Sequence, residues 1–293
     1  MTIGVDVWQF ARELDELREV WRLADAGGFD NLWVCDHLLP FGMREDHGVG
    51  VFEAWTLVAA MAEITKRIRI GVMVTANTFR HPGVLAKIGA TVDHLSGGRL
   101  EFGIGAGGSA GPDEHVQIGL EFPSTGERIR RLREACLVIK ELWTEEVADF
   151  EGRYYRLSAA RSEPKPLQRP YPPFWIGGDG EKLMLRVVAE HADVWNAVGR
   201  HPAPELGHKM AVLDQHCADV GRDPKSIKRS VQVLLGREED LDQTARRIEE
   251  LVQVGFTDVL LLIPPPNPIP RLELAIRELL PEVHRWSGPV ATS

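Results

Sequence analysis

The chain has 293 residues, of which 44% are hydrophobic and 26% charged, and its formal net charge is −9 at pH 7. Such a chain can bury a sizeable core, and its acidic balance without a basic stripe excludes nucleic acid as an expected partner. The N-terminus lacks a basic stretch followed by a long apolar run, and no apolar run is long enough to cross a bilayer. We therefore expect a cytoplasmic protein without a membrane partner.

Short apolar runs rich in β-branched residues alternate along the chain with longer segments of helical period. Strands are predicted for residues 3–7, 31–35, 68–75, 100–105, 174–177, 194–198, 230–235 and 258–263. Between them, apolar residues recur at three- and four-residue spacing, as at Leu14, Leu17, Val20, Trp21 and Ala24. Eight such units match a (β/α)8 barrel better than an open doubly wound sheet. We predict an α/β fold, a TIM barrel in which residues 1–293 form one domain.

Two segments lie outside this alternation. Residues 106–124 form a glycine-rich, acidic connection after the fourth strand. Residues 143–173 contain a hairpin pattern at 150–155 and then a proline-rich stretch. We predict that the second segment is an insertion between helix 4 and strand 5.

A polar pair, Asp36 and His37, directly follows the apolar second strand. Catalytic groups of α/β barrels lie where strands end at the carboxyl face. An imidazole at such a strand end can exchange a proton near neutral pH, and a neighbouring carboxylate can raise its basicity. His37 and Asp36 are therefore the candidate catalytic residues, and the alternative is a hydrogen-bonded pair that closes the strand.

The fourth strand ends in a glycine-rich sequence, with Gly105, Ala106, Gly107 and Gly108 at its end. From Gly103 the spacing is that of a dinucleotide-binding fingerprint, but Pro112 and the polar residues after it predict no prompt helix, which argues against a Rossmann site. Glycines here still let a planar ring or a phosphate approach the backbone. The alternative is a tight structural loop.

A second glycine loop, made of Gly177, Gly178, Asp179 and Gly180, leads from the fifth strand into a helix. Backbone N–H groups at a helix N-terminus favour a phosphate, which predicts a phosphorylated cofactor. The carboxylate of Asp179 is a competing partner for the same N–H groups.

Aromatic and polar residues at other strand ends predict a substrate mouth formed by Trp8, Phe41, Trp195 and Asn196. The chain has ten histidines, but none lies in a metal-binding pair such as H-x-H or H-E-x-x-H. The three cysteines are widely separated. We therefore expect no metal site and no disulfide framework.

Several motifs resemble the luciferase-like monooxygenase superfamily when they are taken together in order. They are residues 28–37 (GFDNLWVCDH), 65–71 (TKRIRIG), 78–82 (TFRHP), 93–99 (DHLSGGR), 126–128 (GER), 150–155 (FEGRYY) and 173–178 (PFWIGG). The pattern is most similar to the branch that uses the deazaflavin coenzyme F420, with FMN as the alternative cofactor. The resemblance covers residues 3–200 well and the rest loosely.

This resemblance implies a (β/α)8 barrel, a homodimer and a flavin-like ring at the carboxyl face. By position, a non-proline cis peptide would join Met73 and Val74. The ring would lie over Val74, Thr75, Ala76 and Asn77 and over the loop from Gly105 to Gly108, with the phosphate at Gly177 to Gly180.

The resemblance also implies that His37 acts beside the transferred hydride. Related dehydrogenases carry a glutamate where this chain has Gly108, and Asp113 or Glu114 could substitute for it. Three hypotheses follow: an F420-dependent oxidoreductase acting on a small organic substrate, an FMN-dependent monooxygenase supplied by a separate reductase, and a flavin-binding barrel without catalysis.

Overall fold

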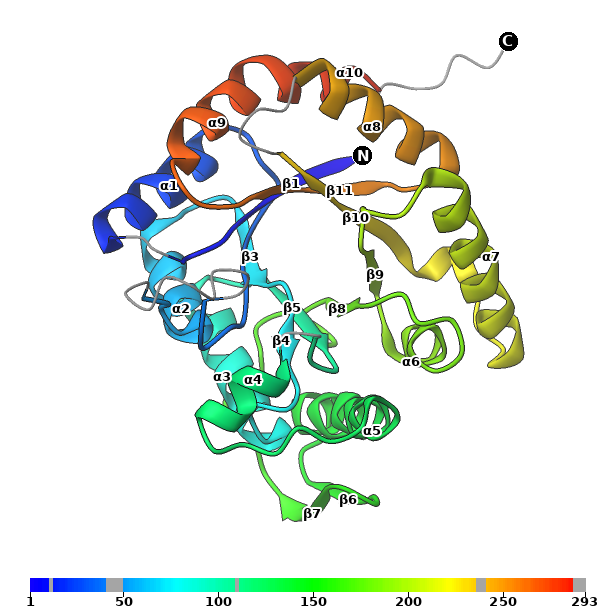
Figure 1. Cartoon of the computed structure of the whole chain (residues 1–293). Helices are drawn as coiled ribbons and strands as arrows, with labels where there is room; N and C mark the ends of the chain where they lie inside the picture. Colours follow the sequence, from blue (N-terminus) through cyan, green and yellow to red (C-terminus); the bar gives the residue numbers. More distant parts are fainter. Residues whose placement is uncertain (11–12, 41–49, 109–110, 236–240, 287–293) are drawn as a thin grey trace.

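The structure, a computed structural model, describes residues 1–10, 13–40, 50–108, 111–235 and 241–286. Parallel strands close into a barrel in the order β3-β2-β1-β11-β10-β9-β8-β5-β4, and β3 also pairs with β5 (Figure 1). The strands are β1 (Thr2–Val7), β2 (Asn31–Val34), β3 (Arg69–Val72), β4 (Thr75–Ala76), β5 (Leu100–Gly105), β8 (Phe174–Gly177), β9 (Val194–Ala197), β10 (Lys228–Leu234) and β11 (Asp258–Ile263). The predicted TIM barrel is confirmed.

The third strand differs from its predicted form. The sequence predicts one strand over residues 68–75, whereas the structure has the two short strands β3 and β4, separated by the cis peptide between Met73 and Val74. Both pieces pair with β5, as at Ile70 with Leu100 and at Thr75 with Ile104. They therefore occupy one position of the barrel wall, and the expected location of the cis bond is confirmed.

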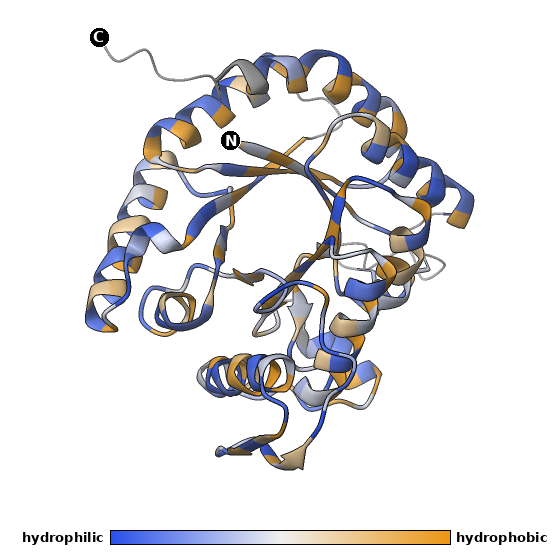
Figure 2. Ribbon diagram, turned by 180° about the vertical axis from the view of Figure 1, so that it is seen from behind, coloured by the Kyte–Doolittle hydropathy of each residue, from blue (hydrophilic) through white to orange (hydrophobic). Residues whose placement is uncertain are grey.

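Helices cover the outside of the barrel (Figure 1). They are α1 (Leu14–Ala26), α2 (Ala54–Ile64), α3 (Pro82–Leu95), α5 (Thr125–Thr144), α6 (Met184–His191), α7 (Ala203–Asp219), α8 (Leu241–Val254) and α9 (Pro268–Leu274), which continues through a π-helical turn (Ala275–Leu279) into α10 (Leu280–Trp286). A short 3₁₀ turn (Pro224–Ser226) precedes β10. Figure 2 shows both hydrophobic and hydrophilic residues along these helices, as expected of helices with one face on the sheet. Within the described ranges no helix is long and apolar enough to span a membrane.

Large side chains fill the barrel interior. The rings of Trp33 on β2 and Trp175 on β8 meet edge-on with 4.7 Å between their centroids, and Met73 and Leu260 pack with them. The open centre of the ribbon in Figure 1 is therefore a packed core. A cavity for a ligand must lie above it, at the carboxyl ends of the strands.

The segment after β5 corrects one expectation. Residues Gly111–Gln117 form helix α4, although Pro112 and the polar residues after it predict no prompt helix. Proline is tolerated in the first turn because its missing N–H needs no partner there, and the acidic Asp113 and Glu114 favour the positive end of the helix dipole. The predicted insertion between α5 and β8 is confirmed, since β6 (Ala148–Glu151) and β7 (Arg156–Ala160) pair as an antiparallel hairpin.

Candidate active site

A cavity of about 370 Å³ lies at the carboxyl ends of the strands, within the size range of small-molecule sites. Most predicted site residues line it: Asp36, His37, Met73, Val74, Ala76, Gly105, Ala106, Gly107, Gly108, Gly177, Gly178 and Asn196. The sequence did not single out five others: Phe79, His115, Met184, Val198 and Gln232. Glu114, which the sequence offered only as a possible substitute for an acid at Gly108, also lines the cavity. The barrel thus brings the glycine loops and the polar pair to one space.

Glycines on two neighbouring strands allow Val74 to form a wall of this cavity. A Cβ atom at Gly105 would lie 2.7 Å from Val74 Cγ2, and one at Gly177 would lie 3.2 Å from the same side chain. Gly107 and Gly178 have φ angles of +84° and +125°, which residues with a side chain adopt only at a cost. Gly105 therefore requires glycine for close packing, and Gly107 and Gly178 require it for backbone conformation. A side chain at Gly177 would need Val74 to shift by a few tenths of an ångström.

The β5 loop is held from behind by residues of other elements. Arg128 of α5 donates from Nε to the carbonyl of Ala106 at 3.1 Å. The backbone N–H of Asn77 donates to the carbonyl of Gly105 at 3.0 Å, and its side chain donates to the hydroxyl of Tyr155 at 3.2 Å. Sequence reasoning gave Arg128 and Tyr155 no site role, although both lie in motifs that carried the family resemblance.

Thr75 does not point into the cavity. Its hydroxyl accepts a hydrogen bond of 2.8 Å from the indole N–H of Trp55 on α2, so it faces the helical layer. Because side chains alternate along a strand, Thr75 faces away while its neighbour Ala76 lines the cavity.

The loop before α6 has its acidic residue engaged elsewhere. Asp179 Oδ2 lies 2.6 Å from Nε2 of His201, and Lys209 donates to the Asp179 carbonyl at 3.2 Å. This carboxylate is therefore held toward α7 and does not compete for the N–H groups of the loop. A phosphate at Gly177 to Gly180 stays a prediction.

The predicted mouth needs a correction at Trp195. Trp195 is fully buried, with 0% of its surface exposed to solvent. The centroid of its ring lies 6.1 Å from that of Phe256, and its indole N–H donates to the carbonyl of Gly178 at 2.8 Å. Consecutive strand residues face opposite sides, so Trp195 supports the β8 loop from outside while Asn196 faces the cavity. Trp8 lies 5.5 Å from the ring of Phe10, and Phe41 lies outside the described residues.

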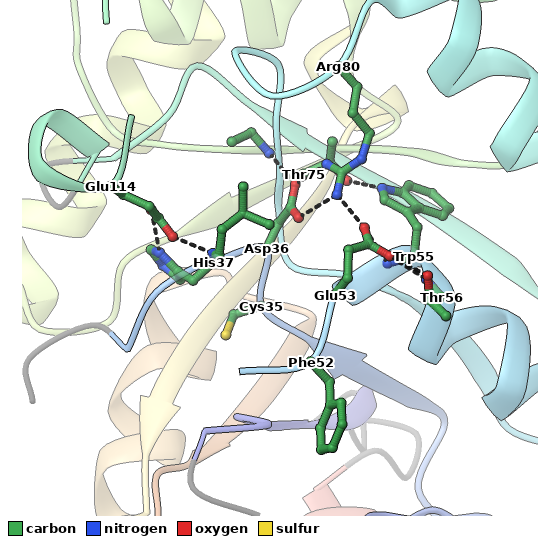
Figure 3. A network of polar contacts seen from close by, with 12 residues as sticks. Cys35, Asp36, His37, Phe52, Glu53, Trp55, Thr56, Thr75, Arg80 and Glu114 are labelled. Atoms are coloured by element: carbon green, nitrogen blue, oxygen red, sulfur yellow. Dashed lines mark hydrogen bonds and ion pairs between the residues drawn. The ribbon is translucent and has the colours of Figure 1, made fainter. Parts of the chain in front are cut away.

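Asp36 is held by an arginine that sequence reasoning did not identify. Arg80 donates to both Asp36 carboxylate oxygens at 2.7 and 3.0 Å, and the backbone N–H of Ala76 donates at 3.0 Å (Figure 3). Arg80 also pairs with Glu53. Burial raises the pKa of Asp36, and these donors partly oppose the increase. Asp36 therefore connects β2 to β4 and to α2.

His37 points the other way, toward α4. Its Nδ1 lies 3.1 Å from Oε2 of Glu114, and Glu114 Oε1 accepts the backbone N–H groups of Leu38 and, at 3.0 Å, Leu39 (Figure 3). Glu114 is only 4% exposed. Burial alone would raise the pKa of Glu114, but the hydrogen bonds from His37, Leu39 and Leu38 lower it below its usual value.

Helix α4 is fixed over the cavity by aromatic contacts. The buried ring of His115 stacks on Phe79 with 4.7 Å between centroids and lies 4.7 Å from Phe122. The guanidinium of Arg128 lies over the ring of Phe122, 3.9 Å from its centroid. These contacts hold the neighbouring Glu114 carboxylate toward His37.

One wall of the cavity suits a flat ring. This wall combines Val74 with glycine backbone, which a planar group can approach closely. A Cβ atom at Gly107 would lie 3.2 Å from Thr78 Oγ1. Both Thr78 Oγ1 and Asn77 Oδ1 are buried without a hydrogen-bond partner among the residues that the structure describes, but neither residue lines the cavity.

The chain is similar to known proteins in sequence. The sequence model of the luciferase-like monooxygenase family matches residues 2–264. An F420-dependent glucose-6-phosphate dehydrogenase of Microbacterium testaceum (strain StLB037) is 31% identical over 245 residues, which are 83% of this chain and 70% of that relative. Five curated relatives with that name are matched over 45% to 70% of their lengths.

Solved structures share the fold. An F420-dependent secondary alcohol dehydrogenase in complex with an F420–acetone adduct matches with a TM-score of 0.84 at 20% identity, over 96% of this chain and 98% of that one. A coenzyme F420-dependent tetrahydromethanopterin reductase from Methanopyrus kandleri matches with a TM-score of 0.79 at 19% identity, over the same shares. At these identities the likeness shows the barrel fold.

Proposed function

Because this chain belongs to the luciferase-like monooxygenase family, we propose that it is an oxidoreductase that uses coenzyme F420 to interconvert a small alcohol and its carbonyl compound. One observation supports the proposal. The glycine wall, which consists of Val74 and the backbone of residues 105–108 and 177–178, lines the same cavity as the His37–Glu114 pair. The wall suits a flat cofactor ring and the pair suits proton exchange. The F420-dependent dehydrogenases among its sequence relatives support the choice of cofactor.

The residues that would hold the cofactor are those of the glycine wall. Val74 and the backbone from Gly105 to Gly108 would contact the ring, and the loop from Gly177 to Gly180 would contact the phosphate. When bound, the oxidised deazaflavin supplies an acceptor for a hydride from the substrate carbon, and the reduced form returns it. Arg128 and Asn77 keep the β5 loop in place through their bonds to the carbonyls of Ala106 and Gly105.

In this proposal His37 accepts and donates the substrate proton. Its side chain lines the cavity and is 27% exposed, so a substrate hydroxyl can reach the imidazole. In oxidation the imidazole accepts the hydroxyl proton, and in reduction the imidazolium returns it to the carbonyl oxygen. The packed layer of Trp33 and Trp175 below excludes water from the floor of the site.

Equilibrium binding of F420 and of FMN to the purified protein tests the cofactor. We expect F420 to bind at least tenfold more tightly than FMN.

Turnover assays test the reaction. Oxidised F420 is assayed with a panel of primary and secondary alcohols and glucose 6-phosphate, and reduced F420 is assayed with ketones, aldehydes and enones. Tight binding of FMN alone would contradict the proposal and favour a monooxygenase, and F420 binding without turnover on any substrate would favour a barrel that only binds the cofactor.

A further inference from the structure

We propose that Glu114 is a positioning residue that holds His37 as the tautomer with its proton on Nδ1, so that Nε2 is the proton-accepting atom of the site. The inference rests on the proposed function, because it names the atom that takes the substrate proton. Related dehydrogenases carry a glutamate at the position of Gly108, and in this proposal Glu114 does not replace it. Glu114 supports the base and does not donate a proton to the cofactor.

The first argument comes from the donors around the carboxylate. Two backbone N–H groups, of Leu38 and Leu39, point at Oε1, and His37 Nδ1 lies 3.1 Å from Oε2. Backbone N–H groups can only donate, so they favour the ionised carboxylate, which can only accept. The direction of the Glu114 pKa shift, downward, agrees. An acceptor at Oε2 requires that Nδ1 carry the proton.

The second argument follows from imidazole chemistry. A neutral imidazole carries one proton, so a proton on Nδ1 leaves Nε2 as an acceptor. A hydrogen bond to one ring nitrogen thus selects the role of the other, as in other histidine–carboxylate pairs. After Nε2 accepts a proton, the ionised Glu114 stabilises the imidazolium in a site where its carboxylate is almost shielded from water.

The pair implies a substrate with a hydroxyl on the carbon that is oxidised. The hydroxyl proton passes to Nε2, the hydrogen on that carbon leaves with two electrons to oxidised F420, and a carbon–oxygen double bond forms. In the reverse direction Nε2 returns its proton to the carbonyl oxygen. Glu114 stays ionised throughout, so it exchanges no atom with the substrate.

The third argument is that α4 is built to hold this carboxylate in place. Glu114 and His115 are 4% and 1% exposed, whereas Val116, the next residue, is 76% exposed. His115 is held between Phe79 and Phe122, so the helix cannot turn Glu114 away from His37 without breaking these ring contacts. Glu114 and His37 are 77 residues apart, and this packing sets their contact.

The test is Glu114→Gln, which keeps the shape of the side chain. Its amide oxygen can still accept the N–H groups of Leu38 and Leu39, which places its NH₂ donor against Nδ1. Nδ1 must then accept, and the proton moves to Nε2. We expect ¹⁵N NMR of histidine-labelled protein without cofactor, at a pH where His37 is neutral, to show an Nδ1–H tautomer in the parent and Nε2–H in the variant.

Kinetics give a second readout. Glu114→Gln should lower kcat for alcohol oxidation, measured per folded protein, by about 10²-fold, with the Kd for F420 nearly unchanged. The matched control is Glu121→Gln, the same change at a side chain that is 87% exposed on the connection after α4, and it should leave the tautomer and kcat unchanged.

An Nε2–H tautomer in the parent protein, or no change of tautomer in Glu114→Gln, would overturn the proposal. So would a kcat loss in the variant that only follows loss of folded protein. The NMR experiment needs no cofactor and no substrate, so it decides the role of Glu114 even if F420 binding, and with it the proposed function, fails.

Discussion

Asp36 and His37 are consecutive residues at the end of β2, yet the structure gives them opposite surroundings. The Asp36 carboxylate faces Arg80 and the backbone of Ala76, within the wall of the barrel. The His37 imidazole faces Glu114 and lines the cavity. Figure 3 shows the two side chains pointing apart. Adjacent polar residues at a strand end thus divide into one structural and one chemical position.

The two side chains differ in the partners that stabilise them. Asp36 is part of a buried ion pair, in which removal of one partner leaves the other charge unpaired. His37 is partly exposed to the cavity and has a carboxylate partner that is itself fixed by backbone donors. Substitution at Asp36 should therefore mainly affect folding, whereas substitution at His37 should mainly affect turnover.

The largest effect is expected for His37→Ala. Turnover should fall by about 10²-fold or more, the usual contribution of a general acid or base, while melting temperature and F420 affinity stay nearly unchanged. All three quantities should be measured on one preparation. If the variant instead loses roughly 1 to 3 kcal/mol of stability and its turnover falls only with the folded fraction, His37 is structural like Asp36.

Asp36→Asn should have the next largest effect, on stability. We expect a loss of about 3 kcal/mol in the free energy of unfolding, because Arg80 loses the charge of its buried partner. Denaturant unfolding checks this. The matched control is Glu151→Gln, which removes the carboxylate from an exposed pair with Arg156 and should change stability by less than about 0.5 kcal/mol. Equal effects of the two substitutions would remove the structural role of Asp36.

A third carboxyl, Asp6 on β1, extends the comparison to pH. Burial raises its pKa to about 7, although a hydrogen bond with Trp8 opposes this, and its Oδ1 has no hydrogen-bond partner among the described residues. Its folded pKa lies above the unfolded value, so the stability that the protonated form contributes is present below about pH 4 and is lost as the pH rises toward 7.

Asp6→Asn removes this titration. At pH 8 the variant should be more stable than the parent by a few kcal/mol, and at pH 4 the difference should be small. Unfolding curves at both pH values measure it. A stability difference that does not depend on pH would mean that Asp6 does not titrate in this range. Glu114, whose pKa is lowered, contributes with the opposite sign and loses its stabilising effect as the pH falls.

The smallest effect is expected for Tyr155→Phe, which removes the hydroxyl that accepts from Asn77. Loss of one partly buried hydrogen bond should cost about 1 kcal/mol. Because Asn77 also holds the carbonyl of Gly105, F420 affinity should fall a few-fold with kcat unchanged. Calorimetry and steady-state kinetics check this, and an unchanged affinity would mean that the hairpin does not support the cofactor loop.

Much of the fold follows from local patterns in the sequence. The alternation of apolar runs with segments of helical period places β1, β2, β5, β8, β9, β10 and β11 nearly where they occur, because burial on a parallel sheet selects such runs. The glycine loops and the polar pair were found because strand ends of a barrel meet at one face. The position of the cis bond came from the family resemblance.

What the sequence could not determine depends on contacts between distant segments. Arg80 reaches Asp36 across 44 positions, and Glu114 reaches His37 across 77, and no local period encodes either distance. The sequence placed Trp195 at the mouth because it predicts the end of the strand but does not predict which side of the sheet the Trp195 side chain faces. Barrel closure and the packing of α4 choose these partners, since buried charges and N–H groups must find compensation wherever the fold places them.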